Sequence, residues 1–360
     1  MTIPNSPKPE SSISSKTGTW NKKIMLVLAK IWSWIKKIQP VLAKIWSWIK
    51  KIPPVYPVFI VIIVGVAILN PAFLTANGIF LFLKRSSSAV ILAVGELFVL
   101  ASGGFDLSIG AMVTFVTIGS AMIINNDPNN ALPAILILIL FGQVVGFLNG
   151  FITAFFRVPS FIVTLGMQLA VTGAALYWCG GGPQGHLSDN FRALANGFIN
   201  NIPIIGRFPI AVIILIVLVG LAYYLFHHSN FGRQILAIGD NQVAAKLSGV
   251  KVRLVRILTF MFSSFFAVVG GILVAGYGGI NSHAGTGLEL NAIAAAVLGG
   301  TASGGGRGSV FGVAVGSLAM EALFTLLNFL GLPKALRDAI QGAIIIAAVA
   351  YLALNARKRK

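Results

Sequence analysis

Runs of apolar residues long enough to cross a lipid bilayer recur from Val55 to Leu354. One helical crossing needs roughly 17–25 such residues. Within lipid each backbone N–H and C=O must find its partner inside the same segment, so these runs are expected to be helices. The strands of a membrane barrel alternate apolar and polar residues, and these runs do not alternate. The sequence therefore predicts an all-α integral membrane protein.

The composition supports this class. Of the 360 residues, 56% are hydrophobic and only 10% are charged, whereas soluble domains keep roughly a quarter of their residues charged. We expect a transmembrane domain over residues 55–356, followed by a short basic tail at 357–360. The predicted spans, about ten, lie near residues 55–70, 86–102, 107–124, 133–155, 160–178, 208–227, 257–276, 288–303, 309–330 and 337–355.

Basic residues are concentrated beside the spans. The net charge is +18, and Lys and Arg gather in the N-terminal segment, between Arg233 and Arg256, and at Arg357–Lys360. Cytoplasmic segments next to membrane helices carry such an excess. With ten spans, both termini and the segment from Arg233 to Arg256 are predicted to be cytoplasmic, and the loop Gly180–Arg207 lies on the other side. This distribution argues against nucleic-acid binding.

The N-terminal region is unlike the rest. Residues 1–19 are rich in Ser, Pro and Lys, which is typical of a disordered tail. A motif then occurs twice, at Val27–Pro40 and Val41–Pro54, within an amphipathic segment at 20–54. In each copy Trp and Ile share one helical face and Lys and Ser share another, a pattern typical of helices lying in the membrane interface. A recent duplication that serves only as an anchor is the alternative.

Three stretches interrupt the apolar runs. Gly299–Gly308 contains too many glycines for an uninterrupted helix, since each costs about 1 kcal/mol there relative to alanine. Non-helical backbone at membrane depth is tolerated where protein buries it or a polar cavity hydrates it, so a broken helix beside a solute pathway is predicted. The other breaks are Gly103–Gly110 and Gly146–Met167. A tight hairpin with a capping Asp is the alternative explanation of Gly103–Gly110.

Glycines at four-residue spacing have a different explanation, because they let two helices approach closely. We assign this packing role to Gly142, Gly146, Gly150, Gly312 and Gly316.

Polar residues near the breaks are candidates for lining a pathway. Glu96 lies within an apolar run, where a carboxylate is costly and usually faces the bundle interior, a cavity or a partner. It is either a pathway residue or a hydrogen-bonded structural acid, and the polar side chains of the third break are either pathway residues or contacts between helices. The candidates are Glu96, Asp106, Ser108, Asn149, Thr164, Gln168, Glu289, Asn291, Gly299, Gly300 and Thr301.

Motifs of ATP binding, metal binding and catalysis are missing from the sequence. The chain has no GxxxxGK(S/T) phosphate loop, no HExxH motif and no Cys/His cluster with metal-ligand spacing. Its single cysteine, Cys179, cannot form an intrachain disulfide. We therefore predict no catalytic residue, metal or cofactor in this chain.

The segment Phe231–Arg256 is mostly polar and basic and lies between two predicted spans. Asp240 or Asn241 is suited to cap a short helix at Gln242–Leu247, and Gly249 to end it. Gly239 and Gly249 are expected to let the backbone turn sharply. A compact helix there suits docking of a soluble partner, and an ordinary basic loop is the alternative. The residues predicted to make the docking contact are Gly232, Arg233, Gly239, Asn241, Ala244, Ala245, Leu247, Ser248 and Gly249.

Four stretches resemble the ribose-type family of ABC sugar permeases and occur in the same order. They are GGFDLSIGA from Gly103, NGFITAFFRVPSFIVTLGM from Asn149, GRQILAIGDNQVAAKLSGVKV from Gly232, and AGTGLELNAIAAAVLGGTASGGGRGSVFG from Ala284. The resemblance extends over nearly all of the chain after the N-terminal repeat.

The resemblance implies import of a monosaccharide, a pentose or a hexose, by alternating access across the plasma (inner) membrane of a bacterium. It implies a second permease subunit, identical or paralogous, ATP-binding subunits that hold ATP and Mg, and an extracytoplasmic sugar-binding protein. The implied fold is that of the vitamin-importing (type II) ABC permeases, with about ten helices per subunit. The docking segment then couples the permease to the ATP-binding subunits. A stand-alone secondary transporter or channel for a small polar solute is the alternative function.

The N-terminal repeat gives a direct test. A peptide covering Lys22–Pro54 is expected to gain helicity on anionic vesicles and to be released at high salt, because salt screens the attraction of its lysines to the lipid. Circular dichroism and vesicle flotation measure the two effects, with zwitterionic vesicles as the control. A peptide that neither binds nor folds on anionic vesicles contradicts the interfacial assignment.

Overall fold

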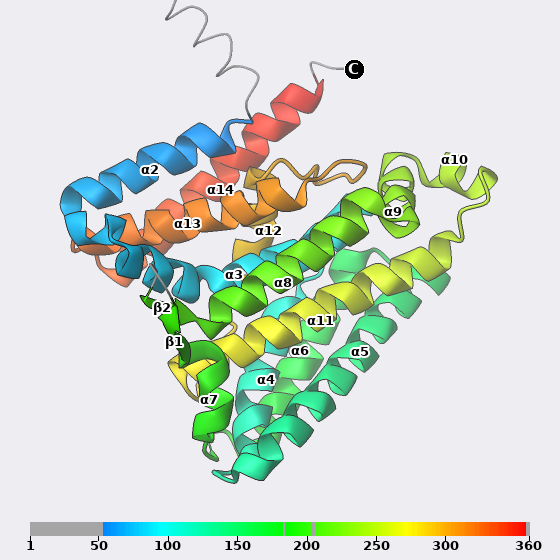
Figure 1. The fold of residues 1–360 in the computed structure, drawn as a ribbon. Helices are drawn as coiled ribbons and strands as arrows, with labels where there is room; N and C mark the ends of the chain where they lie inside the picture. The colour runs from blue at the N-terminus through cyan, green and yellow to red at the C-terminus, as the bar shows by residue number, and fades with distance from the viewer. Residues whose placement is uncertain (1–52, 183, 203–205, 358–360) are drawn as a thin grey trace, which may run out of the picture. The chain divides into compact units, whose positions relative to one another are not determined.

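The computed structural model describes residues 53–182, 184–202 and 206–357 (Figure 1). The tail predicted at 1–19 and the repeated motif up to residue 52 lie outside the described residues, as do residues 358–360 of the basic tail.

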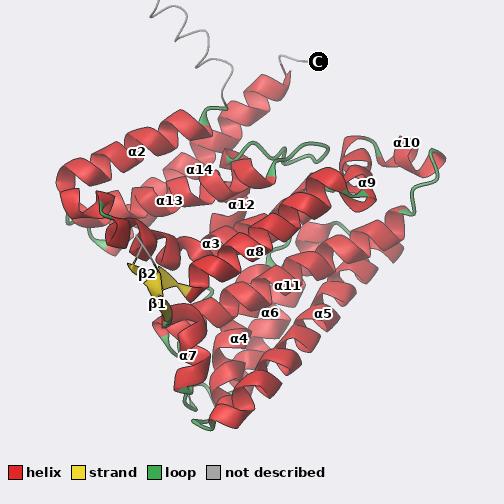
Figure 2. Ribbon diagram, viewed as in Figure 1, coloured by secondary structure: helices red, strands yellow, loops and turns green. Residues whose placement is uncertain are grey.

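Helices dominate the described part of the chain (Figure 2). Each predicted span overlaps one helix of the following set: α2 (Val55–Leu69), α3 (Ala76–Ala101), α4 (Ser108–Ile124), α5 (Ala131–Phe155), α6 (Ser160–Trp178), α8 (Ile210–Tyr223), α11 (Val252–Gly278), α12 (Leu288–Leu298), α13 (Val310–Phe329) and α14 (Lys334–Arg357). The shorter elements are η1 (Pro71–Leu74), η2 (Pro128–Asn130), α7 (Asp189–Asn196), β1 (Phe198–Ile202), β2 (Gly206–Pro209), η3 (Tyr224–His228), α9 (Asn230–Asp240) and α10 (Gln242–Leu247).

Helical segments long and apolar enough to cross a membrane number 6 within the described residues. They are Ala76–Ala101, Pro128–Phe155, Ser160–Trp178, Ile210–His228, Val252–Gly278 and Val310–Phe329. The helices α2, α4 and α12 are apolar but shorter. The chain is thus built as an integral membrane protein, with fewer full-length spans among its described residues than the ten expected. Three of the other predicted spans fold as these shorter helices, and the fourth is α14, which is not among the six.

The region Gly180–Arg207 departs from the all-helical expectation. It contains α7 and an antiparallel hairpin of β1 and β2, in which Phe198 pairs with Pro209. Asn201 and Gly206, on the two strands beside the hairpin turn, have left-handed backbone conformations with φ of 64° and 76°. Such residues let a chain reverse direction tightly, and outside a span the edges of a short hairpin are not excluded by lipid.

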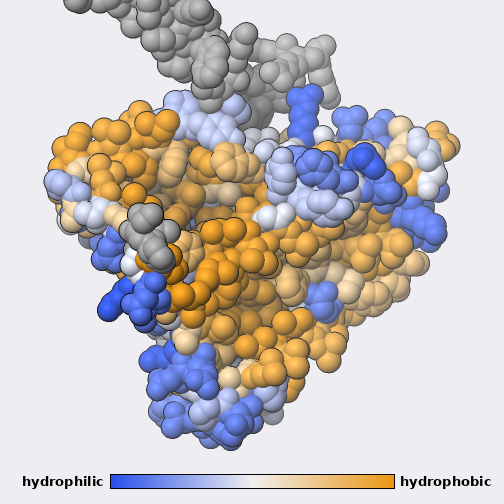
Figure 3. Space-filling view, viewed as in Figure 1, coloured by the Kyte–Doolittle hydropathy of each residue, from blue (hydrophilic) through white to orange (hydrophobic). Residues whose placement is uncertain are grey.

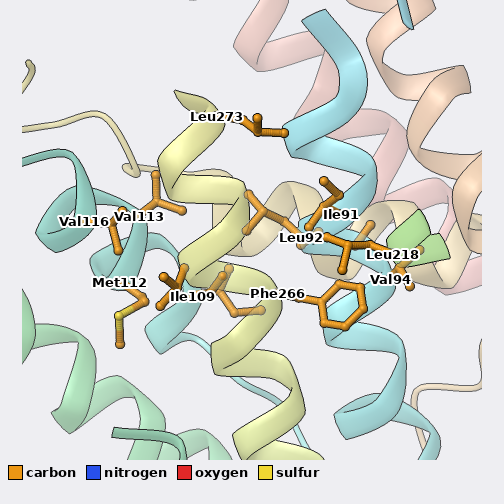
Figure 4. Packing of buried hydrophobic residues seen from close by; sticks show 14 of the residues in the cluster. Ile91, Leu92, Val94, Ile109, Met112, Val113, Val116, Leu218, Phe266 and Leu273 are labelled. Atoms are coloured by element: carbon orange, nitrogen blue, oxygen red, sulfur yellow. The ribbon is translucent and has the colours of Figure 1, made fainter. Parts of the chain in front are cut away.

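The centre of the bundle is α11, which packs against α5, α3 and α4. Figure 4 shows the apolar side chains of α3, α4, α8 and α11 that meet there, including the fully buried Phe266 of α11. The glycines assigned to packing lie where a Cβ would touch a neighbouring helix: Gly142, Gly146, Gly150, Gly312 and Gly316. At Gly150, for example, a Cβ would lie 2.5 Å from the Cα of Ile257 in α11. The packing role predicted for these glycines is confirmed.

The two ends of the helix bundle carry different elements. We call the first the α10 end: it holds α9, α10, the turn 102–107 and the loop 299–309. Here the Gly306 N–H donates to the carbonyl of Ala101 at the end of α3, at 2.9 Å. The other, the α7 end, holds α7 and the hairpin. Figure 3 shows hydrophilic residues gathered at both ends, with hydrophobic surface between them.

The helix α12 crosses only part of a bilayer. Its 11 residues rise about 16 Å, roughly half of the ~30 Å hydrocarbon core. The predicted span 288–303 ends early because Gly299 and Gly300 close the helix, Gly300 with φ of 93°. The segment that precedes α12 packs against the middle of α4, where the Gly285 N–H donates to Thr114 Oγ1 at 3.0 Å. The predicted break is therefore present, and α12 is interrupted at both ends.

Candidate functional site

A cluster of buried polar side chains surrounds the turn between α3 and α4. Asp106, in this turn, is completely buried. One of its carboxylate oxygens accepts hydrogen bonds from the backbone N–H and hydroxyl of Ser108, and the other accepts one from Ser263 Oγ of α11 at 2.8 Å. Asp106 thus ties the first residue of α4 to α11, which agrees with the capping role considered for it.

Glu96, on α3, belongs to the same cluster and is also completely buried. Its Oε1 accepts a hydrogen bond from the Asp106 N–H at 3.2 Å, while Oε2 has no hydrogen-bond partner in the described chain. Of the two explanations of Glu96, the geometry favours the hydrogen-bonded structural acid.

Helices α5 and α6 complete the cluster. Asn149 of α5 donates from Nδ2 to Ser108 Oγ at 2.9 Å. Ser160 and Thr164 of α6 accept hydrogen bonds from the N–H groups of residues 105 and 107, at 2.9 and 3.1 Å. Five predicted pathway residues therefore meet here as one hydrogen-bonded unit: Glu96, Asp106, Ser108, Asn149 and Thr164.

Two members of this unit, Ser160 and Ser263, were not among the predicted site residues. Ser263 is a polar residue inside the apolar run of α11, so its polarity was the available signal. Its partner, Asp106, lies far away in sequence, and nothing local specifies that pairing.

A second polar contact lies where α4, α6 and α12 meet. Gln168 of α6 donates from Nε2 to Glu289 Oε1 of α12 at 3.3 Å. Glu289 is 8% exposed, and its other oxygen lies against Gly110 of α4, where a Cβ would collide with it. Asn291, further along α12, lines a small separate cavity beside α3 and α13 that includes Glu321. The sequence placed Gln168 and Glu289 on the pathway without indicating that they touch.

The glycines that end α12 have separate roles. A Cβ at Gly299 would lie 2.5 Å from the Cα of Val313 in α13, so Gly299 is needed for close packing. Gly300 takes the left-handed conformation that turns the chain. Thr301 is completely buried, and its hydroxyl has no partner in the described chain.

Further along the loop, glycines make contact with α9 and with the end of α3. A Cβ at Gly305 would lie 2.7 Å from the Cα of Gly239 in α9 and 2.8 Å from the nitrogen of Gly103. One at Gly306 would lie 2.9 Å from the Cα of Asp240. We call Gly103, Gly239, Gly305 and Gly306 the glycine junction. It brings three separate chain segments into backbone contact at the α10 end.

The predicted docking helix is present as α10, with the predicted bounds Gln242–Leu247. Asn241, rather than Asp240, caps it. The Oδ1 atom of Asn241 accepts hydrogen bonds from the backbone N–H groups of residues 243 and 244, at 3.0 Å each. Gly249 ends it with φ of 85°.

Two expectations about the docking segment are wrong. Gly239, expected to turn the chain, lies within the helix α9, and its small size serves the glycine junction. Ala245, expected to touch a partner, is 4% exposed and packs inside this chain, because it lies on the inner face of α10. The exposed apolar side chains are Leu247, which was predicted, and Val243, which was not, at 85% and 71% exposure.

The other predicted docking residues lie on α9 or on the outside of α10. Gly232 is buried at the start of α9, where its N–H donates to Ser229 Oγ at 3.3 Å. Arg233, Ala244 and Ser248 are exposed, and the Ser248 hydroxyl donates to the carbonyl of Ala244 at 3.0 Å.

Comparison with known proteins gives consistent matches. The family described as "Branched-chain amino acid transport system / permease component" matches residues 78–349. The ribose import permease protein RbsC of Escherichia coli is 34% identical over 299 residues, which cover 81% of this chain and 90% of that protein. The galactose/methyl galactoside import permease protein MglC of Salmonella typhimurium is 33% identical over 322 residues, 85% of this chain and 95% of that protein. The probable ABC transporter permease protein YphD of Escherichia coli is 35% identical over 292 residues, 81% and 86% of the two chains. No solved structure matches the chain.

The bond from the Asp106 N–H to Glu96 gives a stability prediction. Glu96→Leu removes the acceptor and leaves a buried N–H unpaired, which should lower the free energy of unfolding by about 1–3 kcal/mol. Glu96→Gln keeps an acceptor oxygen and should lose much less. Unfolding of the purified variants in detergent, followed by circular dichroism, measures the difference. Equal stability of Glu96→Leu and the parent protein would show that this contact does not hold the turn.

Proposed function

This chain belongs to the family described as the permease component of the branched-chain amino acid transport system, and from that membership we propose that it is the membrane-spanning permease subunit of an ATP-driven ABC importer for a monosaccharide. It is a multi-pass inner-membrane protein and a transport subunit, not an enzyme. ATP hydrolysis belongs to partner subunits, which hold the ATP and Mg. The observation that carries the proposal is the similarity to sugar permeases over more than four fifths of the chain.

The names of the relatives bear on the substrate. The family description names branched-chain amino acids, but RbsC and MglC, each matched over at least nine tenths of its own length, are named for ribose and for galactose or methyl galactoside. A pentose or hexose offers hydroxyl groups and no charge. The amide of Gln168 and the carboxyl of Glu289, which meet between α6 and α12, are suited to hydrogen bonding with such a solute.

The exposed apolar face of α10 supports a coupling role. Val243 and Leu247 lie four residues apart, so they share one face of this helix. Each exposes most of its side chain at the α10 end. Burial of these side chains in a groove of an ATP-binding subunit would stabilise the complex through the hydrophobic effect. The predicted contact residues Ala244 and Ser248 follow Val243 and Leu247 along the chain and border the same surface.

The glycine junction offers a route from that surface into the permease. A movement of α9 displaces Gly239, and Gly239 touches Gly305 of the α12–α13 loop as well as the end of α3. Closely packed backbone contacts are hardly compressible and therefore transmit displacement. The movement would then reach the α3–α4 turn and the end of α12 together. Two of the three predicted breaks, Gly103–Gly110 and Gly299–Gly308, would then change position when the partner subunits close.

The complete importer is proposed to contain a second permease subunit, identical or paralogous, ATP-binding subunits and an extracytoplasmic sugar-binding protein. Within the permease, α2, α4, α12 and α14 add to the six long spans, which gives about ten membrane helices in a type II arrangement with both termini in the cytoplasm. The pair Gln168–Glu289 and the end of α12 would lie along the alternating-access pathway.

Reconstitution of all subunits in proteoliposomes tests the function. We expect uptake of one labelled pentose or hexose that needs both ATP and the sugar-binding protein. Parallel assays with labelled leucine and valine should show no uptake. Import of either amino acid would assign the chain to the other substrate class. Uptake down a gradient in the absence of the ATP-binding subunits would identify a stand-alone transporter or channel.

The variant Leu247→Glu tests the coupling role of α10. A carboxylate in an apolar docking contact must lose its hydration, so we expect co-purification of the ATP-binding subunit and substrate-stimulated ATP hydrolysis to fall at least tenfold. The side chain is exposed, so the thermal unfolding of the isolated permease should not change. Ile199→Glu, which places a carboxylate at an exposed apolar position of the α7 end, is the matched control. Normal ATP hydrolysis with Leu247→Glu would exclude α10 as the coupling element.

A further inference from the structure

A cavity of about 560 Å³ lies directly behind α10, between the end of α5 and the start of α11. Its charged lining residues are all basic: Arg157, Lys246, Lys251, Arg253 and Arg256. Among the described residues, no acidic side chain lines it. Loops that follow the positive-inside rule carry scattered cations, whereas these five converge on one hollow, so the cavity is suited to an anion.

Two of these cations are held in place by neutral groups. Arg256 donates from Nη2 to Gln242 Oε1 of α10 at 2.9 Å. The guanidinium of Arg253 lies 4.8 Å from the ring centre of Phe155, a cation–π contact. Neither contact neutralises the charge, so the cations are positioned and remain available to a ligand.

A hydroxyl group in the cavity also lacks a partner. Thr153, on the last turns of α5, is 5% exposed and lines the cavity. Its Oγ1 makes no hydrogen bond within the described chain. A buried hydroxyl without a partner is unfavourable by about 1–3 kcal/mol. A phosphoryl oxygen in the cavity would accept this hydrogen bond and remove that cost.

Arg157 occupies an unusual backbone position. It follows the end of α5 with φ of 57°, a left-handed conformation that costs a side chain of this kind roughly 1–2 kcal/mol and that Gly or Asn adopts more readily.

Exposed apolar side chains lie at the cavity. Phe155 and Leu254 line it and are 44% and 50% exposed, and Phe156, the next residue after Phe155, is 69% exposed. One turn beyond Leu254, Leu258 lines a second hollow of about 460 Å³ whose other lining residues are apolar apart from one glutamine. The hydrophobic surface in Figure 3 lies next to the hydrophilic residues of the α10 end. The basic cavity therefore adjoins an apolar surface, as a site for a lipid headgroup and its acyl chain would require.

We propose that this cavity binds an anionic phospholipid. Its phosphate lies among the five basic residues and accepts the Thr153 hydroxyl, and an acyl chain follows Leu254 and Leu258. Basic pockets between membrane helices on the cytoplasmic side are suited to such headgroups. An acidic segment of the ATP-binding subunit fits less well. Gln242 and Lys246 line the cavity and so lie on one face of α10. The apolar face proposed for docking, with Val243 and Leu247, is the neighbouring face of the same helix.

The test is lipid retention by the full chain. The permease is assembled in nanodiscs with equal amounts of phosphatidylglycerol and phosphatidylcholine, released into mild detergent, and examined by native mass spectrometry. We expect phosphatidylglycerol to be retained preferentially and to be lost in 1 M salt, where screening is strong. The double variant Lys251→Gln/Arg253→Gln, in exposed positions, should reduce this retention roughly tenfold or more, as expected for two cations near a headgroup.

The control removes the same charge elsewhere. Arg207 and Arg307 are exposed and do not line the cavity, so Arg207→Gln/Arg307→Gln should retain phosphatidylglycerol as the parent does. Equal loss in both variants, or equal retention of the two lipids by the parent protein, would overturn the proposal. Displacement of the lipid by millimolar inorganic phosphate would also overturn it, in favour of a site for a soluble anion. Loss of ATP-subunit binding with normal lipid retention would identify a protein contact instead. Lipid retention needs neither ATP nor sugar, so its outcome is separate from that of the uptake assay.

Discussion

The turn between α3 and α4 places backbone polar groups inside an apolar helix bundle, and the site depends on how those groups are satisfied. Three successive N–H groups, at residues 105–107, donate to Ser160, Glu96 and Thr164. An unpaired group in their place would cost about 1–3 kcal/mol. Each side-chain acceptor is fixed on its own helix, so α3 and α6 cannot move independently of the turn. The Asp106 carboxylate extends the same constraint to α11 through Ser263.

The sequence is most informative where one short stretch contains the whole cause of a structure. Apolar runs locate the helices because the lipid requirement acts on each segment separately. The bounds of α10 agree with the prediction because its cap, Asn241, and its terminating residue, Gly249, are both local. The hairpin in the region Gly180–Arg207 and the inward position of Ala245 depend on what packs against them. No pattern within these stretches contains that information, so the expectations failed there.

Glycine illustrates the same limit. The dense glycines after α12 correctly indicate a break, but Gly239 was expected to turn the chain and instead lies within a helix. Its role comes from its contact with Gly305, which is remote in sequence. A single sequence gives the positions at which a side chain is missing. It does not distinguish a missing side chain that frees the backbone from one that admits another chain segment.

The short length of α10 explains why its surroundings matter to function. A helix of 6 residues is far below the roughly 12–15 residues at which isolated helices become marginally stable, so its cap and its inner contacts must hold it. Ala245 is packed inside the chain, and Gln242 is bound to Arg256 at the start of α11. If α10 is the coupling element, a force applied at Leu247 would pass through these contacts into α11, and through α9 into the glycine junction. An anion bound among the basic residues behind α10 would relieve their mutual repulsion and stiffen this support. Under the two proposals, the basic cavity and the docking face are two sides of one element, and a lipid bound in the cavity would set how firmly a partner subunit could act on the permease.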